Sequence, residues 1–225
     1  MPQYKAPLRD INFVLKNVLN ANEHFASLAG REEVSEDLLD AILSEGAKFS
    51  ENVLSPLNQV GDQEGCVWSE DGVKTPTGFK EAYQQFAEGG WPSMTADARF
   101  GGQGLPNQVA YAAFELWTSA NMAFGLIPLL GLSAIELLQT YGTAEQKEVY
   151  MRRLISGEWT STMELTEPQA GSDLGRLTTR AVPDGDHYRL TGRKIFISWG
   201  EHDLTDNMVH MVLARIRGAP AGHRG

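Results

Sequence analysis

The sequence predicts an α+β fold, in which an N-terminal all-α helical domain is followed by an incomplete antiparallel β-domain. Two observations carry this prediction. The apolar residues repeat about every 3.6 positions up to Gly157, and about every second position after it. Helices first and strands second are typical of α+β proteins or of two domains. The expected divisions are residues 1–34 for an N-terminal extension helix, 35–158 for the helical domain and 159–225 for the partial β-domain.

The first two helices are predicted from their caps and apolar stripes. Asp10 can cap one helix, and Ser35 starts a second, which Pro56 should stop. The polar stretch 62–76 is expected to be a loop. Another irregular stretch is expected at 89–106, where glycine and proline are frequent.

Four further helices are predicted from the spacing of apolar residues and from local end signals. Gly142 should end one of them in the left-handed conformation, and Thr143 with Gln146 makes a capping box for the next. The expected ranges are 79–86, 107–122, 127–141 and 143–157.

Short strands with alternating apolar residues are predicted in the last third of the chain, at 159–166, 178–182, 187–191, 194–199 and 208–215. So few short strands leave unpaired edges and one bare face. The chain is therefore expected to be the front part of a longer protein. A complete small protein with a disordered tail over 217–225 is the alternative.

Composition and charge exclude several functional classes. The formal charge is −10, without a Lys/Arg block, which disfavours nucleic-acid binding. The single cysteine, Cys66, excludes an internal disulfide and a Cys-rich metal site. Residues 1–10 lack an apolar signal core, so a cytoplasmic location is expected. The apolar run 122–132 is shorter than the about 20 residues that span a bilayer, so no membrane association is expected.

No metal site is predicted, because none of the five histidines has a partner at zinc-ligand spacing. The acidic and histidine cluster at 201–203 is expected to be a solvated loop. The glycine-rich stretch 100–104 lacks the third glycine of a dinucleotide fingerprint and is expected to be a turn before a helix.

The richest segment is 163–173, where a strand enters a Pro/Gly turn that ends in Ser-Asp. Gly171 permits close approach of a ligand, Ser172 adds a hydroxyl, and turned backbone amides form an anion nest. These features suit a heterocycle edge plus a phosphate. The alternative is a tight turn with Asp173 as its cap. A second segment, 192–200, has aromatic residues and a serine, and its alternative is an ordinary buried strand.

These two segments resemble the signatures of the acyl-CoA dehydrogenase family, a T-E-P-x-A-G-S-D turn followed by a G-x-K-x-[FW]-I-[ST]-x-G strand. Residues 99–106 resemble the family's Y-G-G-x-G-L-P loop, and residues 140–147 its G-T-x-E-Q-K link. Residues 2–15 resemble the N-terminal extension of a subgroup that includes 3-methylmercaptopropionyl-CoA dehydrogenases. The family fold has a helical domain, a middle β-domain and a C-terminal helical bundle, and this chain matches the first and part of the second.

The resemblance implies an FAD-dependent enzyme that forms a trans-α,β double bond in an acyl-CoA thioester, of the fatty-acid or 3-methylthiopropanoyl type. A glutamate removes the α-proton, the flavin takes the β-hydride, and an electron-transfer flavoprotein takes the electrons. That glutamate belongs to the C-terminal bundle, so no catalytic residue is expected within the 225 residues and the chain alone should be inactive. The full-length protein is expected to be a homo-oligomer.

The resemblance also implies the contacts of the cofactor. Met163, Leu165 and Thr166 would line the flavin ring and bond its pyrimidine edge. Gly171 and Ser172 would lie by the pyrophosphate, with Ser172 also reaching the CoA arm. Phe196, Ile197 and Ser198 would pack on the isoalloxazine. The apolar stretch 126–138 would wall the acyl pocket.

Two other functions remain open from the sequence. One is a complete, non-catalytic helical binding module that keeps the first segment as a structural turn. The other is a flavin-dependent oxidase of the same fold.

Overall fold

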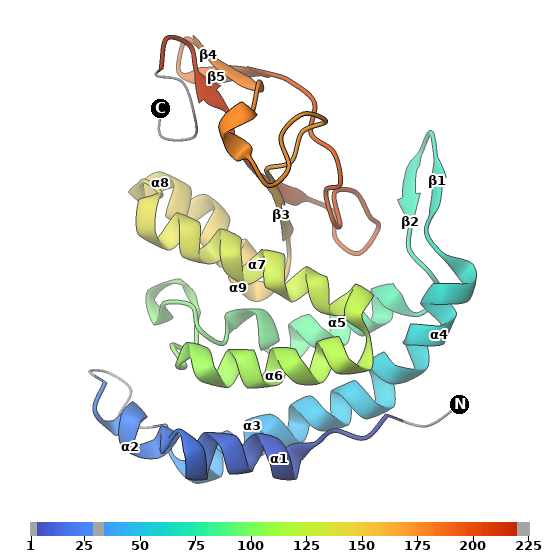
Figure 1. Ribbon diagram of the computed structural model, residues 1–225, viewed down its shortest axis with the longest axis vertical. Coiled ribbons are helices and arrows are strands. Elements are labelled where there is room, and N and C mark those ends of the chain that lie inside the picture. The colour runs from blue at the N-terminus through green and yellow to red at the C-terminus, as the bar shows by residue number, and fades with distance from the viewer. Residues whose placement is uncertain (1–3, 29–33, 220–225) are drawn as a thin grey trace.

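The computed structural model describes residues 4–28 and 34–219, with a helical part first and a β part second. Figure 1 shows the helices in layers beneath the strands: α1 and α3 in one layer, α5 and α6 in the next, and α7 above them. The predicted α+β class is confirmed. The predicted tail lies outside the described residues from residue 220 onward.

The helical part consists of α-helices that are joined in places by π-helical and 3-10 turns (η). These are α1 (Leu8–Phe13), η1 (Val14–Val18), α2 (Ala21–Ala26), α3 (Glu36–Phe49), η2 (Ser50–Leu54), α4 (Ser55–Glu64), α5 (Phe79–Glu88), η3 (Trp91–Ser93), η4 (Ala98–Phe100), α6 (Asn107–Ala120), α7 (Met122–Tyr141), α8 (Ala144–Gln146), η5 (Lys147–Met151) and α9 (Arg152–Ser156).

The strands are short, and most belong to the C-terminal third of the chain. They are β1 (Val67–Ser69), β2 (Gly72–Lys74), β3 (Thr160–Glu164), β4 (Arg180–Asp184), β5 (His187–Thr191), β6 (Met208–Val212) and β7 (Arg215–Ile216), with one 3-10 turn, η6 (Leu174–Arg176).

Two helix starts follow the predicted caps. The Ser35 hydroxyl accepts a 3.2 Å hydrogen bond from the Leu38 N–H. Thr143 and Gln146 exchange backbone-to-side-chain bonds of 2.9 and 3.1 Å, which completes the capping box. The first helix begins earlier than predicted, with Pro7 at its N-cap and Asp10 within its first turn. Local side-chain chemistry thus decides where these helices begin.

The predicted stop at Pro56 is wrong, since the helix continues as α4 to Glu64. A wide π-helical turn, η2, precedes Pro56 and places it in the first turn of α4. The widened π-helical turn just before Pro56 accommodates its missing N–H without ending the helix. The predicted loop at 62–76 is therefore shorter, and it contains the antiparallel hairpin β1–β2.

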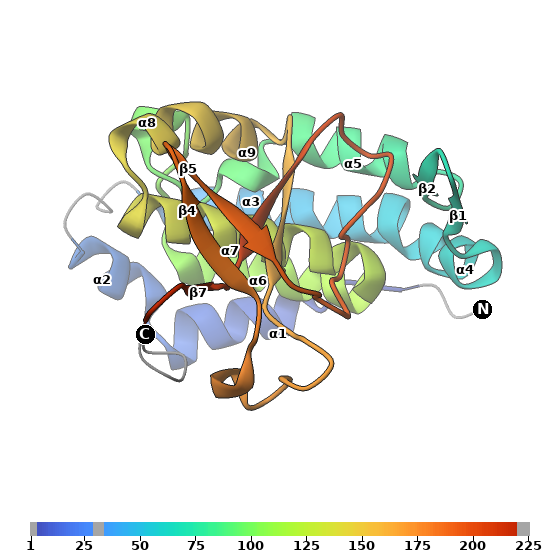
Figure 2. The ribbon, with the colours of Figure 1, turned by 90° about the horizontal axis from the view of Figure 1, so that it is seen from above.

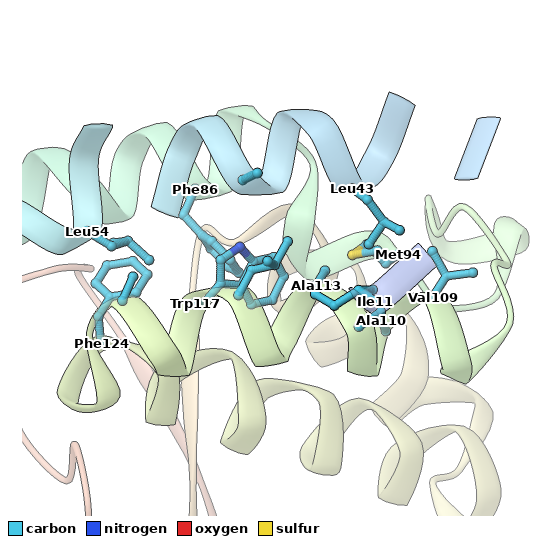
Figure 3. Packing of buried hydrophobic residues seen from close by; sticks show 14 of the residues in the cluster. Ile11, Leu43, Leu54, Phe86, Met94, Val109, Ala110, Ala113, Trp117 and Phe124 are labelled. Atoms are coloured by element: carbon cyan, nitrogen blue, oxygen red, sulfur yellow. The ribbon is translucent and has the colours of Figure 1, made fainter. Parts of the chain in front are cut away.

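The core of the helical part combines aliphatic side chains with a group of aromatic rings (Figure 3). The Phe86 ring lies 5.0 Å from Trp117 and 5.8 Å from Phe124, edge-to-face in both cases. Trp117 is 1% exposed and Phe124 is fully buried. Edge-to-face contact brings the positive edge of one ring to the negative face of another, which adds to the apolar burial.

The irregular stretch predicted at 89–106 is confirmed, apart from the turns η3 and η4. It folds back on itself, and the Gly104 N–H donates a 3.0 Å bond to the Ala96 carbonyl. A Cβ at Gly102 would lie only 2.0 Å from that same oxygen. Glycine is therefore needed at residue 102 for the backbone to approach so closely.

Helix α7 begins five residues before the predicted 127–141, because Asn121 caps it. The Asn121 Oδ1 accepts a 3.0 Å bond from the Phe124 N–H. The predicted left-handed end is wrong, since Gly142 has φ −66° and an extended backbone.

Helix α7 is 20 residues long and, in the part of the chain that the structure describes, is the one helix long and apolar enough to cross a membrane. The core helix of a soluble domain has the same length and composition. Here α7 contributes Phe124 and Ile127 to one hydrophobic cluster and Ile135 and Leu138 to a second. Of its most apolar stretch 39% is buried in the structure, so packing against the chain accounts for part of its apolar character.

The strand pairing is mixed, which corrects the antiparallel prediction. β4 and β5 form the predicted antiparallel hairpin, whereas β3 pairs with β6 and β4 with β7 in parallel. Only a tight hairpin forces neighbouring strands to run in opposite directions. β6 and β7 follow a long connection, residues 192–207, which returns the chain to run in the same direction as β3 and β4.

The strand predicted at 194–199 is wrong. Phe196 and Trp199 have φ of 56° and 55°, in the left-handed region that no strand contains. In Figure 2 the connection between β5 and β6 reaches toward α5. Within this segment Trp199 contacts the helical part at Ala123 and Phe79, whereas Phe196 is 87% exposed, so the alternating apolar pattern does not reflect a pleated strand.

Candidate functional site

The first candidate segment leaves the end of β3 and forms a tight turn. Glu167 and Ala170 exchange backbone hydrogen bonds of 2.9 and 3.0 Å. The Asp173 Oδ1 then accepts a 3.1 Å bond from the Gly175 N–H and caps η6. The backbone is therefore the capped turn that was the alternative reading of this segment.

That turn presents open space to a ligand. Gly171 and Ser172 are exposed, and a Cβ at Gly171 would meet no atom within 4 Å. The turn is a structural feature and an accessible surface at once, so the two interpretations do not exclude each other.

The second candidate segment lies directly beside the first. The Ile195 N–H donates a 3.0 Å bond to the Thr166 carbonyl. The Lys194 Nζ donates a 2.9 Å bond to the Leu165 carbonyl. Residues 165–166 and 194–195, far apart in the sequence, therefore form one continuous surface.

This surface carries an aromatic side chain that the protein leaves uncovered. Phe196 is 87% exposed and has φ 56°. A bulky residue in the left-handed region costs about 1–3 kcal/mol, and such strain concentrates at functional sites. Ser198 is also exposed, while Ile197 is half-buried.

A buried ion pair lies beneath the surface. The Lys194 Nζ is 2.9 Å from the Glu167 Oε1, with side chains 7% and 1% exposed. The Glu167 carboxylate also accepts from the Thr178 N–H at 2.7 Å, the Thr179 N–H at 3.0 Å and the Gln169 Nε2 at 2.6 Å. These partners satisfy the desolvated carboxylate.

The pKa of Glu167 lies well below its usual value. Burial opposes ionisation of the carboxyl, but the hydrogen bonds from residues 178 and 179 and from Lys194 outweigh it. Glu167 is therefore a permanent anion at neutral pH and is already engaged by its neighbours.

Glu164 is engaged as well. Its Oε1 lies 2.9 Å from the His210 Nδ1, and that nitrogen is 2.8 Å from the Thr162 hydroxyl. All three side chains belong to the β3–β6 pair. Neither glutamate of the first segment is thus a free base.

The sequence predicts a solvated loop at 201–203, but only Glu201 is exposed. His202 is 6% exposed, and its Nδ1 accepts a 3.2 Å bond from the Leu204 N–H. The Asp203 Oδ1 accepts from the Thr75 N–H and hydroxyl at 3.0 and 2.7 Å. Burial disfavours the charged imidazolium and so lowers the pKa of His202. Burial would raise the pKa of Asp203, but the hydrogen bonds from Thr75 outweigh it, and the pKa of Asp203 is lowered.

Among residues 4–28 and 34–219, no group of three or more His, Cys, Asp or Glu side chains could hold a metal ion.

The predicted contact residues share one property: each is at least partly accessible. Half-buried are Met163, Leu165, Thr166 and Ile197, and exposed are Gly171, Ser172, Phe196 and Ser198. Residue patterns do not reveal the Glu167–Lys194 and Glu164–His210 contacts. The one available signal for the first was that both of its members belong to the two candidate segments.

The residues fit a flavin. An exposed aromatic face, half-buried aliphatic neighbours and hydroxyls suit a flat heterocycle with polar edges. The open turn at Gly171 offers room for a phosphate beside backbone amides. Bound FAD would supply the hydride acceptor, and the chain would supply position and electrostatics.

Comparison with known proteins places the chain in one family. Residues 40–158 match the model of the acyl-CoA dehydrogenase N-terminal domain, and residues 162–225 match that of the acyl-CoA dehydrogenase middle domain. A 3-methylmercaptopropionyl-CoA dehydrogenase from Ruegeria pomeroyi is 46% identical over 223 residues, 99% of this chain and 38% of that protein. The chain thus spans about two fifths of the length of that relative.

Solved structures share the fold. A glutaryl-CoA dehydrogenase from Mycobacterium smegmatis in complex with FADH2 has a TM-score of 0.67 and 23% identity, covering 84% of this chain and 45% of that one. A structure of the electron transferring flavoprotein of Acidaminococcus fermentans has a TM-score of 0.62 and 28% identity. The match covers 73% of this chain and 40% of that one. With both of its regions matched, this chain belongs to the acyl-CoA dehydrogenase family, whose members depend on FAD.

Proposed function

We propose that this chain supplies the flavin-binding surface of an enzyme that introduces a trans-α,β double bond into an acyl-CoA thioester. The observation that carries the proposal is the junction of Thr166 with Ile195, which unites two family segments beneath an exposed, strained Phe196. Among the large apolar side chains of the described residues, Phe196 is the most exposed, at 87%.

The proposed roles follow the accessibility of each residue. Met163, Leu165 and Thr166 lie along the flavin ring and its pyrimidine edge. Phe196, Ile197 and Ser198 contact the face of the ring. The turn at 171–172 binds the pyrophosphate through its backbone, and the Ser172 hydroxyl also contacts the CoA arm. Donors directed at the thioester carbonyl would stabilise the enolate-like charge that develops there.

We propose that the base for the α-proton comes from a segment that the 225 residues do not contain. Glu164 is bound to His210, and Glu167 to Lys194. A general base must be free to approach the proton that it removes. The 225-residue chain alone is then inactive in dehydrogenation.

The proposed substrate is a fatty acyl-CoA or 3-methylthiopropanoyl-CoA. The name of the Ruegeria relative supports the second. The apolar residues 126–138 of α7, which lie against β3 through the Ser161–Leu130 bond of 3.3 Å, would wall the acyl chain. The proposed electron acceptor is an electron-transfer flavoprotein, and we propose a cytoplasmic homo-oligomer.

The test uses the protein expressed from its complete gene. It should purify with bound FAD, and a panel of straight-chain acyl-CoAs and 3-methylthiopropanoyl-CoA should bleach the flavin absorbance without oxygen. Reoxidation by an electron-transfer flavoprotein but not by oxygen identifies a dehydrogenase. Rapid reoxidation by oxygen would identify an oxidase instead. A colourless protein that takes up no FAD would overturn the proposal.

A further inference from the structure

Residues 194–199 form an arch whose two ends are held and whose middle is free. Phe196 and Ser198 are exposed along it, and both Phe196 and Trp199 have left-handed backbones. An exposed segment with strained backbone does not keep its shape unless its surroundings impose it. The contacts at the two ends of the arch are therefore decisive.

The first end is Lys194, which is tied to the first candidate segment. Its Nζ lies 2.9 Å from the Leu165 carbonyl and 2.9 Å from the Glu167 carboxylate. The Lys194 side chain is only 7% exposed, so these charge-assisted bonds are shielded from water. This end fixes the distance between residues 165–166 and the arch.

The second end is Trp199, which is tied to the helical part. Its Nε1–H donates a 2.9 Å bond to the Ala123 carbonyl at the start of α7. Its ring stacks on Phe79 of α5, with centroids 6.3 Å apart, and meets His202 edge-on at 5.7 Å. This end fixes the arch relative to the helices.

We propose that Lys194 and Trp199 are positioning residues, which hold the 194–199 arch in the shape that receives the flavin ring before the flavin arrives. The inference rests on the proposed function. Neither side chain needs to touch the cofactor, since each acts through the backbone that carries residues 196–198. An arch that is already held in shape reduces the entropic cost of binding.

The experiment compares the FAD affinity of the protein expressed from its complete gene with that of two variants, measured by quenching of flavin fluorescence. Lys194→Met removes the bonds to Leu165 and Glu167 at the first end. Trp199→Phe removes the indole N–H that bonds to Ala123 but keeps an aromatic ring. The matched controls are Lys16→Met, which breaks an ion pair with Asp40 at 2.8 Å, and Trp68→Phe, on a ring 72% exposed. Both test variants should bind FAD on the order of tenfold more weakly, as loss of supporting partners does elsewhere. The controls should match the wild type.

Two further measurements separate positioning from general destabilisation. The double variant Glu167→Gln/Lys194→Met leaves no unpaired buried charge, so it should regain melting temperature but not FAD affinity. Without flavin, amide hydrogen exchange should accelerate at Ile195 in Lys194→Met and at Gly200 in Trp199→Phe. These N–H groups bond to Thr166 and Ile197 at the ends of the arch.

Wild-type FAD affinity in the test variants, or an affinity loss that follows melting temperature across all variants and controls, would overturn the positioning role and leave the proposed function standing. A wild-type protein without any FAD affinity would overturn both.

Discussion

The helical part and the β part of the chain are stabilised in different ways. In the helical part, rings such as Phe86, Trp117 and Phe124 are almost fully buried against one another. In the β part, all residues of β5 are exposed, and the buried side chains include the charged pair Glu167 and Lys194 beside a few small or aliphatic ones. The hydrophobic effect does not depend on the orientation of the groups, whereas a buried ion pair stabilises the fold only when its distances and angles are favourable. The region proposed to bind the flavin is thus the region where a buried ion pair takes a large part in holding the chain in shape.

The largest effect should come from a core ring. Phe124→Ala should lower the free energy of unfolding by about 4 kcal/mol, because it leaves a cavity among Phe49, Phe79 and Phe86. Chemical denaturation followed by circular dichroism measures it. Phe13→Ala, on a ring 58% exposed, is the control and should stay within about 0.5 kcal/mol of wild type. Equal effects of the two would erase the contrast between core and surface.

The next largest effect should come from the ion pair. Glu167→Gln leaves the Lys194 ammonium buried without its counter-charge and should cost about 3 kcal/mol in unfolding free energy. Hydrogen exchange of β4 and β5 amides should rise more than that of α6 amides. If α6 responded equally, the two parts would be one cooperative unit and the comparison would fail.

The pH dependence of that effect has a defined sign. The pKa of Glu167 is lowered from 4.5 in the folded chain, so its contribution is complete above pH 4.5 and is lost as the pH falls below it. The difference in melting temperature between wild type and Glu167→Gln should therefore narrow in acid. A constant difference from neutral pH to pH 3, which is about 1.5 units below the ordinary value of 4.5, would contradict an ionised Glu167.

A smaller effect should come from His202 near neutral pH. Burial lowers its pKa from 6.5, against the opposing charge of Asp203 and with a small contribution from His210. The unfolded chain takes up the proton first, so stability should fall as the pH drops below 6.5. His202→Asn should lack this part of the loss of stability, which is measured by comparing the melting temperatures of the two proteins across this pH range. Parallel declines would show that other groups are responsible.

The smallest effect should come from an exposed pair on the helical surface. Glu148→Gln loosens the 2.9 Å contact with Arg152 one turn away and should lower the melting temperature only slightly. High salt should remove the difference from wild type, because both side chains are more than half exposed. A loss comparable to that of Glu167→Gln would show that burial does not distinguish the two ion pairs.

Sequence patterns predicted what depends on near neighbours. Ser35 and Thr143 cap helices through residues three positions away, and those starts are confirmed. Pro56 was misjudged because a π-helical turn shifts its position, and such a turn has no residue signature. Residues 194–199 alternate like a strand, but distant partners of Lys194 and Trp199 override that pattern. The predicted contact residues are accessible, while the ion pair that joins their segments is 27 positions apart and invisible to periodicity.

The contact of Thr75 with Asp203 joins residues that are 128 positions apart. At a synthesis rate of about 5–20 residues per second, Asp203 leaves the ribosome about 6–26 s after Thr75. Helical cores form far faster than that. The nascent helices therefore have time to assemble before their late partner emerges, and the surface beside the arch is completed after them.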